Sequence, residues 1–516
     1  MINKRLLGRL LSSTSSGALA ALRLDFSGLT LDPRVTFARA SNATVNDARL
    51  EAPSLHLPFA SITPGQYVSY GLTFARGSHA TLVGPDRMLT FAPNNLLLNS
   101  ATLSTQSVTV TGAWHIVSFK GTGQIVLSGA ATGTIVGTSA NDRVFLRFKP
   151  TAGSLTLTVT GSVTNARLSA VTYETAPRDV DDYETTAAAY YGPRRAYDRL
   201  TGDFEGVWVE ETRTCYALHN RNLADAVWTK TNVTAAQDQV GVDGVANSAS
   251  SIVATAANGT VLQSITDASR ARCLAADVKR VNGTGTIQMT MDNGTTWTSV
   301  TVTSTTQWTR VSIPSQTLAN PVIGFRIATS GDAIAVDFVQ TENGAVSTSR
   351  IFTEAAQVAR AAETLEITGS AFSNFYNSTE GTFIVEWEAP DVSASSRYVW
   401  SVSDGTNNNR NFALVSATSP RAQAVVAGVS GSTAASTPTV SPDVLYKMAT
   451  LYSAAGYANV HNGGTVASVA STWGSSVNKF TIGAGPTGAT NLNAKIRSVT
   501  YYRQRLSDSR VQALTT

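Results

Sequence analysis

Residues 154–159 read SLTLTV, and residues 286–291 read TIQMTM. In both stretches a small or polar residue alternates with an apolar one, which places the apolar side chains on one face of an extended strand. Turn sequences such as Asn282-Gly283 and Asn293-Gly294 lie beside the second stretch. Short alternating strands separated by tight turns are typical of antiparallel sandwiches and jelly rolls, not of parallel α/β sheets.

The composition supports an all-β chain. The 516 residues include 53 Ser and 68 Thr, and only 14% of residues are charged. Glu and Lys are too scarce for a long helical protein or a coiled coil, and a hydrophobic fraction of 42% disfavours disorder. At roughly 100–200 residues per domain, the length predicts several β-rich modules, each large enough for its own core.

The charge pattern excludes several classes of partner. The net charge is +4, and no basic run is longer than Arg194-Arg195, so we expect no nucleic-acid partner. No stretch of 18 apolar residues occurs, so we expect no membrane insertion. The basic start gives way at residue 12 to a Ser-rich run, and we therefore expect no export signal.

The two cysteines and five histidines show no metal-binding spacing. Cys215 and Cys273 are either one bridge or two free thiols, and the sequence leaves both alternatives open.

A nine-residue element occurs twice near the N-terminus. Residues 36–44 (TFARASNAT) and residues 73–81 (TFARGSHAT) are identical at seven of nine positions, and residues 358–362 (VARAA) are a shorter echo. The alternation of apolar residue, small residue and Arg predicts a strand edge followed by a turn.

We divide the chain into five segments. They are an N-terminal region with the duplicated element (residues 1–93), a first jelly roll (94–176), a charged connector (177–213), a second jelly roll (214–350) and a C-terminal concanavalin-like sandwich (351–516). The connector is predicted to be solvated, with weak local ion pairs, and a docking surface for a neighbouring subunit is the alternative. Near the C-terminus, residues 507–510 (SDSR) are predicted to cap a last helical turn that ends at Leu514, with Ser or Asp at the N-cap.

Three further segments carry a family resemblance. Residues 197–214 (YDRLTGDFEGVWVEETRT), residues 222–232 (NLADAVWTKTN) and residues 501–515 (YYRQRLSDSRVQALT) are, with the duplicated element, similar to segments of tailed-bacteriophage virion proteins. The resemblance extends from about residue 31 to the C-terminus. One departure is Cys215, which stands where the family has Asn.

The resemblance implies fibre or spike proteins with carbohydrate-binding jelly rolls and a concanavalin/laminin-G-like C-terminal domain. It predicts a non-enzymatic virion component (tail fibre, spike or head fibre) that contacts host-surface glycans. Residues 1–93 would dock to capsid, portal, neck or tail proteins, and the chain would form a homo-oligomer, a trimer by analogy. A glycan-degrading tailspike and a purely architectural decoration or collar protein are the alternatives.

Candidate sugar contacts lie near two polar loops of the C-terminal segment. Aromatic faces stack on sugar rings while amides and other polar groups bond the hydroxyls. The candidates are Trp400, Asn409, His461 and Trp473, and burial in the core is the favoured alternative for each tryptophan. Trp114, Trp228 and Trp308 lie in alternating runs and are predicted to be core residues.

The sequence gives no convincing catalytic or cofactor site. Glu386 and Glu388 flank Trp387 and share one strand face, but the third acidic residue that comparable glycanases need is missing, so we predict no catalysis. The loop at residues 404–409 offers oxygen ligands for Ca²⁺, but its sole acidic residue is Asp404, and an ordinary Asn/Gly turn is favoured. We therefore predict no cofactor.

Overall fold

The computed structural model describes residues 52–63, 66–172, 176, 184–394 and 396–516. The chain divides into two compact units, Met1–Leu50 and Glu51–Thr516, and all described residues belong to the second. Strands account for 49% of the residues and helices for 4%, which confirms the predicted all-β class. The first copy of the duplicated element, at residues 36–44, lies outside the described residues.

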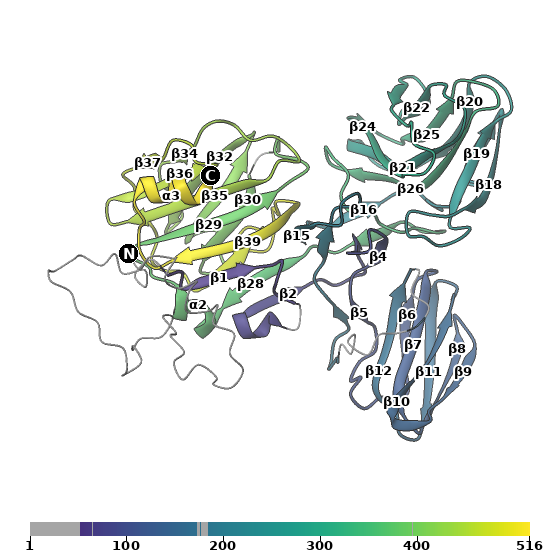
Figure 1. Cartoon of the computed structure of the whole chain (residues 1–516), viewed down its shortest axis with the longest axis horizontal. Coiled ribbons are helices and arrows are strands. Elements are labelled where there is room, and N and C mark those ends of the chain that lie inside the picture. The colour runs from purple at the N-terminus through teal and green to yellow at the C-terminus, as the bar shows by residue number, and fades with distance from the viewer. Residues whose placement is uncertain (1–51, 64–65, 173–175, 177–183, 395) are drawn as a thin grey trace, which may run out of the picture. The chain divides into compact units, whose positions relative to one another are not determined.

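The first sandwich contains the SLTLTV stretch and packs a three-stranded sheet against a four-stranded one (Figure 1). In the SLTLTV strand Leu155 and Leu157 are fully buried, while Thr158 and Thr160 are exposed, so the predicted alternation is confirmed. The sheet orders are β10-β7-β12 and β6-β11-β8-β9. The strands are β6 (Gln106–Val110), β7 (Trp114–Gly121), β8 (Gln124–Gly129), β9 (Gly133–Val136), β10 (Ser139–Phe148), β11 (Gly153–Thr160) and β12 (Thr164–Val171).

The second sandwich has two five-stranded antiparallel sheets, whose orders are β17-β20-β25-β22-β23 and β18-β19-β26-β21-β24. Trp228 is fully buried in its core, as predicted. Trp308 is partly buried and packs on a small separate cluster. The strands are β17 (Thr229–Thr231), β18 (Val233–Gln239), β19 (Ala249–Ala254), β20 (Gly259–Ser264), β21 (Arg270–Asn282), β22 (Ile287–Thr290), β23 (Thr298–Val300), β24 (Thr309–Leu318), β25 (Val322–Ile327) and β26 (Ala333–Asn343).

The third sandwich contains two eight-stranded sheets and the largest hydrophobic core. One sheet runs β14-β15-β39-β29-β35-β36-β37 with β1 beside β39, and the other runs β2-β28-β38-β30-β31-β32-β33 with β34 beside β32. The strands are β1 (Leu55–Pro58), β2 (Leu72–Ala75), β14 (Arg195–Tyr197), β15 (Phe204–Val209), β28 (Thr364–Thr368), β29 (Gly381–Glu388), β30 (Arg397–Ser403), β31 (Arg410–Ser416), β32 (Ser419–Val426), β33 (Val429–Ser430), β34 (Ala434–Ala435), β35 (Tyr446–Ser453), β36 (Gly456–His461), β37 (Ala467–Val469), β38 (Lys479–Ile482) and β39 (Ala494–Tyr502).

The third sandwich is assembled from three separated stretches of sequence, which differs from the division made above. Strands β1 and β2 come from the N-terminal region, and β14 and β15 come from the charged connector. Leu57 and Val207 are both fully buried in its core. Antiparallel pairing with β39 and β28 satisfies the backbone of these segments, which are therefore integral parts of the fold.

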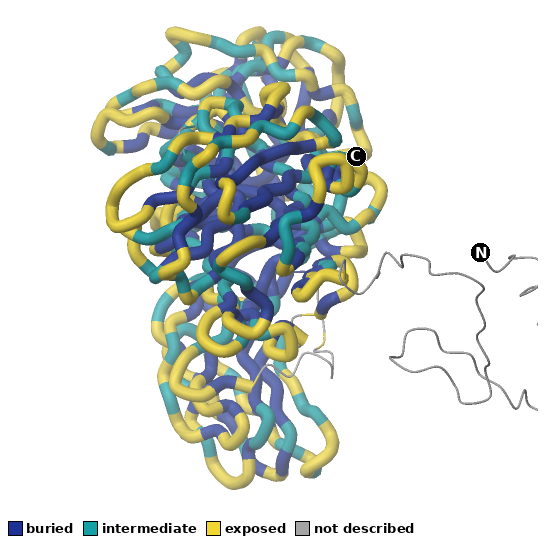
Figure 2. Tube along the Cα trace, turned by 90° about the vertical axis from the view of Figure 1, so that its left-hand side faces the viewer, coloured by how far each residue is buried: buried dark blue, intermediate teal, exposed yellow. Residues whose placement is uncertain are grey.

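Short two-stranded ladders join the three sandwiches. They pair β3 (Thr81–Val83) with β4 (Leu89–Phe91), β5 (Asn94–Asn95) with β13 (Tyr190–Tyr191), and β16 (Arg213–Cys215) with β27 (Val358–Arg360). Buried residues gather in the interior of the sandwiches, while turns and outer strands such as β10 and β18 also carry exposed residues (Figure 2).

Among the residues that the structure describes, the helices are short. They are the 3₁₀ turn η2 (Val68–Tyr70), α2 (Gly369–Phe375) and α3 (Asp508–Thr515). The Ser507 side chain accepts a hydrogen bond from the Arg510 amide, which confirms the predicted N-cap. In the described part of the chain no helix is long and apolar enough to cross a membrane. Cys215 and Cys273 are both buried free thiols, so the bridge alternative is excluded.

Candidate functional site

The two tryptophans predicted as sugar contacts lie inside the third sandwich. Trp400 is fully buried and stacks on Phe383, with ring centroids 4.2 Å apart. Trp473 is 7% exposed, stacks on Tyr452 at 4.5 Å, and donates its indole N–H to the hydroxyl of Tyr376 at 3.2 Å. Both therefore follow the burial alternative, and neither offers a free face to a ligand.

The other two candidates are occupied by local contacts. His461 is 2% exposed, its Nδ1 lies 2.9 Å from the Ser436 hydroxyl, and burial lowers its pKa. Asn409 is half-buried; its amide donates to Asp404 at 2.9 Å, and its carbonyl accepts the backbone N–H of Ala427. The structure therefore does not bring the four candidates together at one surface.

The Asp404 loop is an internally bonded turn. One carboxylate oxygen of Asp404 accepts the backbone and side-chain bonds of Thr406, and the other accepts the Asn409 amide. Within the described ranges no group of three or more His, Cys, Asp and Glu residues could hold a metal ion.

Glu386 and Glu388 lie on the outer face of β29, as expected, with Trp387 fully buried between them. Glu388 forms an ion pair with Lys495 at 2.7 Å, and Glu386 lies opposite Lys447 across the strand pair. Both glutamates are half-buried on the outer face of a central strand, which pairs with β39 and β35, so the strand is not an edge strand.

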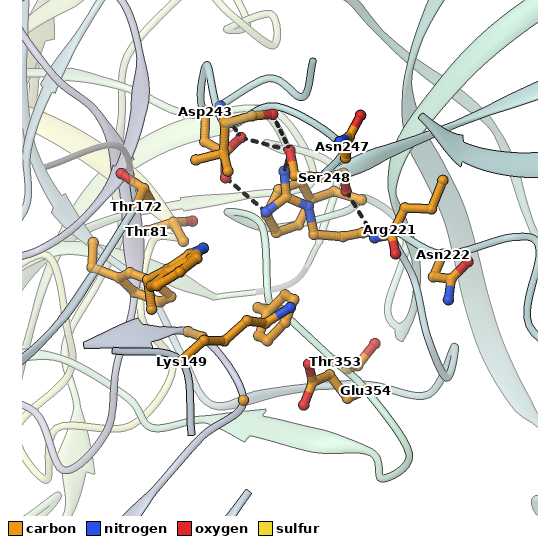
Figure 3. A pocket seen from close by; sticks show the side chains of 18 of the residues that line it. Thr81, Lys149, Thr172, Arg221, Asn222, Asp243, Asn247, Ser248, Thr353 and Glu354 are labelled. Carbon is orange, nitrogen blue, oxygen red and sulfur yellow. Dashed lines mark hydrogen bonds and ion pairs between the residues drawn. The ribbon is translucent and has the colours of Figure 1, made fainter. Parts of the chain in front are cut away.

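A pocket of about 360 Å³ lies where the first and second sandwiches meet (Figure 3). The first sandwich contributes Trp114 at the start of β7 and Lys149 just after β10. The second contributes polar residues from the loops around Asn222 and Asn247, and residues 352–354 complete the lining. The lining thus combines aromatic rings, hydroxyl groups, the amides of Asn222, Gln237 and Asn247, and charged groups.

Arg221 forms a rigid wall of the pocket. Its guanidinium donates two bonds to Asp337, at 2.7 and 3.0 Å, and one to Asp243 at 2.7 Å, and it lies over the Phe338 ring at 4.4 Å. Burial alone would lower the pKa of Arg221, but the two carboxylates raise it. Ser248 also bonds both Arg221 and Asp243, so this wall is fixed before any ligand enters.

Two charged side chains of the pocket have no partner within the described ranges. Lys149 is exposed and Glu354 is half-buried, and neither side chain forms a hydrogen bond or an ion pair with a described residue. Gly112 leaves room for Glu354, because a Cβ at position 112 would lie 1.7 Å from its carboxylate oxygen. The pocket therefore presents a free cation and a free carboxylate.

Trp114 is half-buried in the pocket wall, although it was predicted to be a core residue. The Arg147 guanidinium lies 3.9 Å above its ring and donates to the Thr172 carbonyl at 3.0 Å. The stack holds the indole in place. Trp114, Lys149 and Glu354 belong to three distant segments of the sequence. No local sequence pattern therefore indicated that they line one site.

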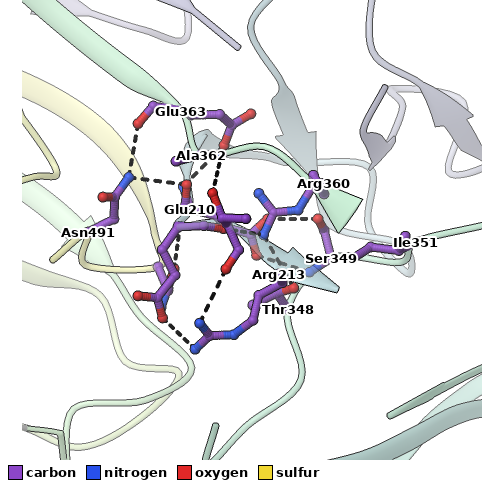
Figure 4. A network of polar contacts seen from close by, with 12 residues as sticks. Glu210, Arg213, Thr348, Ser349, Ile351, Arg360, Ala362, Glu363 and Asn491 are labelled. Carbon is purple, nitrogen blue, oxygen red and sulfur yellow. Dashed lines mark hydrogen bonds and ion pairs between the residues drawn. The ribbon is translucent and has the colours of Figure 1, made fainter. Parts of the chain in front are cut away.

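A second cluster, the buried network, joins the third sandwich to the junction ladders (Figure 4). Arg194 is fully buried between two carboxylates, at 2.5 Å from Glu210 and 2.5 Å from Glu363. Arg76 donates to Glu363 at 2.8 Å, and Arg360 lies 3.3 Å from Glu210. The connector therefore supplies buried structural ion pairs here, and the prediction of a solvated connector is wrong for Arg194 and Glu210.

The network keeps its carboxyl groups ionised. Burial raises the pKa of Glu210, but Arg194 and Arg360 outweigh it and lower the pKa to about 2. The pKa of Glu363 is also lowered, chiefly by Arg194 against the effect of burial. The Asn491 amide donates to the backbone carbonyls of Glu210 and Glu363, which ties the third sandwich to the same point.

The repeated Ala-Arg element has a structural role. Arg76 of the second TFAR copy and Arg360 of the VARAA echo are far apart in the sequence, and both belong to the buried network. Glu210 belongs to the EETRT segment that carries the family resemblance. The repeat was visible in the sequence, but the buried carboxylates that it meets were not.

Comparisons with known proteins identify no family. No family model matches, and no curated protein matches. Among solved structures, the Ruminococcus gnavus IT-sialidase CBM40 is 16% identical, over 27% of this chain and 84% of that one, with a TM-score of 0.24. The tandem CBM22 domains of Paenibacillus barcinonensis Xyn10C are 11% identical, over 60% and 100%, with a TM-score of 0.21.

Domains LG4-5 of the mouse laminin alpha1 chain are 10% identical, over 58% of this chain and 91% of that one, with a TM-score of 0.19. These proteins share sandwich architecture with the chain. At such TM-scores the likenesses carry no functional argument.

Proposed function

We propose that the chain is a non-enzymatic structural component of a bacteriophage virion that binds host-surface glycan in the pocket between its first two sandwiches. The observation that carries the glycan proposal is the pair of unpartnered charges, Lys149 and Glu354, facing a pocket of about 360 Å³. A sugar ring supplies hydroxyl groups that both accept and donate hydrogen bonds, so it can satisfy an ammonium and a carboxylate together.

The remaining lining suits the same ligand. Asn222 and Asn247 add amide groups, and Trp114 adds an aromatic surface beside them. Sites of this volume with a few convergent polar groups and an aromatic wall are typical of small-ligand binding. The rigid Arg221 wall reduces the entropy that binding must overcome, because these side chains are already ordered.

The pocket is proposed to bind without cleaving. Glycosidases generally need two carboxyl groups flanking the scissile bond. Here Glu354 is free, whereas Asp243 is engaged by hydrogen bonds from Arg221 and Ser248.

The virion assignment rests on the sequence resemblance in residues 197–214, 222–232 and 501–515. In this proposal the chain is a fibre, spike or head fibre, located in the virion and attached to capsid, portal, neck or tail proteins. A homo-oligomer, such as a trimer, would multiply a weak single-site affinity, because the second and third contacts become intramolecular.

The test is a host-glycan array probed with the full chain, followed by calorimetry on the hits. Glu354→Gln removes the free carboxylate and should weaken binding about tenfold, because hydrogen bonds to charged groups contribute about 1.5–3 kcal/mol. The matched control is Glu184→Gln, an exposed glutamate without a described side-chain contact, which should bind as the wild type does.

Two outcomes would contradict the proposal. Absence of any glycan hit, with virions lacking the chain adsorbing normally, would support an architectural decoration or collar protein. Release of sugar fragments from host polysaccharide, abolished by Glu386→Gln, would support a glycan-degrading tailspike.

A further inference from the structure

A second cavity, of about 410 Å³, lies between the second and third sandwiches. Its third-sandwich wall includes Glu205 and Trp208 of β15, and its second-sandwich wall includes Arg310 of β24 and the nearby Arg350. Arg199, which follows β14, lies in the same lining. We call this cavity the arginine cleft, after Arg199, Arg310 and Arg350.

Two of the three guanidiniums share one buried carboxylate. Arg350 donates to both oxygens of Asp277, at 2.7 and 2.6 Å, and Arg310 donates to Asp277 at 3.0 Å. Asp277 is fully buried, and despite that burial Arg350 and Arg310 lower its pKa. A single negative charge thus holds two positive ones at the cleft wall.

Of the three cleft arginines, Arg199 is the one that forms no ion pair with the described part of the chain. Its described hydrogen bond is to the Val242 carbonyl at 3.3 Å. Burial lowers its pKa. A guanidinium carries five N–H donors, so Arg199 has donors left over at the cleft.

The carboxylates near the cleft are already engaged, with one exception. Asp198 accepts the backbone amides of Leu200 and Thr201, and Glu205 pairs with Lys495 at 3.1 Å. The more distant Asp337 and Asp243 are held by Arg221. The exception is Asp443, which is exposed at the edge of the cleft. Partial burial of its carboxyl group and the nearby Glu388 raise its pKa.

We propose that the arginine cleft is a second binding site, separate from the pocket, which takes the carboxylate of an acidic sugar against Arg199 and Arg350. Arg–carboxylate pairs are short, directional and strong compared with neutral hydrogen bonds. Arg350 lines the cleft, and its second terminal nitrogen forms neither of the two bonds to Asp277. Trp208 and the hydroxyl of Ser312 supply contacts for the sugar ring.

The experiment is an NMR-detected titration of the full chain with glucuronate, glucose and inorganic phosphate at low ionic strength. Glucuronate should bind. Glucose, which lacks the carboxylate, should bind with an affinity lower by a factor of about ten or more. Arg199→Gln should lower the affinity for glucuronate by about tenfold. The control is Arg503→Gln, the same change of charge at an exposed arginine of the third sandwich.

A second variant tests the location without changing charge. Ser312 is exposed in the cleft lining, so Ser312→Trp should fold normally and block glucuronate binding by filling the cleft. Equal binding of glucuronate and glucose, or wild-type affinity in Arg199→Gln, would overturn the proposal. Phosphate binding more tightly than glucuronate would overturn the assignment to a sugar. Binding of neutral glycan in the pocket is a separate measurement, so the two sites can fail independently.

Discussion

The pocket and the buried network use the same residue types in opposite ways. In the buried network Arg194, Glu210 and Glu363 are fully buried, and each charge is matched by an opposite one at hydrogen-bond distance. In the pocket Lys149 and Glu354 face open space without a described partner. Charges compensated inside the protein hold its parts together, whereas charges left uncompensated at a cavity are available for a ligand.

The largest effect should come from breaking the buried network. Glu363→Gln removes the carboxylate shared by Arg76 and Arg194 and leaves two buried guanidiniums undercompensated. Breaking a buried pair in this way costs about 3–5 kcal/mol of the free energy of unfolding. Urea denaturation of the full chain measures the loss.

The control for this change is Glu366→Gln, which removes a partly exposed ion pair with Lys479. Exposed pairs contribute about 0–1 kcal/mol, so the control should be nearly neutral. Similar losses in both variants would show that burial does not distinguish the buried network from an ordinary surface pair.

A smaller loss of stability is expected on acidification. As the pH falls, it should come from buried histidines at a higher pH than from the carboxylates of the buried network. His115 is fully buried, and burial lowers its pKa from 6.5 to about 4, so it stays neutral in the folded protein. The unfolded chain binds a proton below pH 6.5. The contribution of His115 is therefore complete above pH 6.5 and falls by about 1.4 kcal/mol per pH unit as the pH drops toward 4.

His115→Phe should reduce the pH dependence by this share, because a phenyl ring can keep the stacking on Phe148 without titrating. His79 acts with the same sign, since burial lowers its pKa to about 3. Glu210, with a pKa of about 2, remains ionised throughout this range. Denaturation at pH 7, 6 and 5 compares the variants; an unchanged slope in His115→Phe would assign the acid sensitivity elsewhere.

The smallest effect on stability, with a clear effect on binding, is expected at Gly112. A methyl group there would meet the end of the flexible Glu354 side chain, which can move into the open pocket. Gly112→Ala should therefore change the free energy of unfolding by less than about 1 kcal/mol. It should weaken glycan binding as Glu354→Gln does, measured by calorimetry. Wild-type affinity would show that the position of Glu354 does not matter.

Much of the fold was predictable from local pattern. The alternation at residues 154–159 located a strand and its buried face, and Ser507 located the start of the last helix. The participation of residues 55–58 and 204–209 in the third sandwich was not predictable, because β1 and β15 pair with a strand near the C-terminus. Pairing over such separations leaves no local signature.

The candidate site was less predictable. Trp400 and Trp473 are candidates as aromatic residues near polar loops, and the aromatic core buries both, which is the favoured alternative for each. Charged residues usually indicate surface, so the burial of Arg194 was unexpected. The pocket depends on Trp114, Lys149 and Glu354 meeting from distant segments, which only the tertiary structure specifies.

The most direct test of glycan binding in the pocket is a crystal structure of the full chain with an oligosaccharide from the host surface. The account predicts a sugar ring between Lys149 and Glu354, with Asn222 or Asn247 bonding its hydroxyl groups. A sugar bound instead at the loop containing Asn409, with the pocket empty, would contradict it.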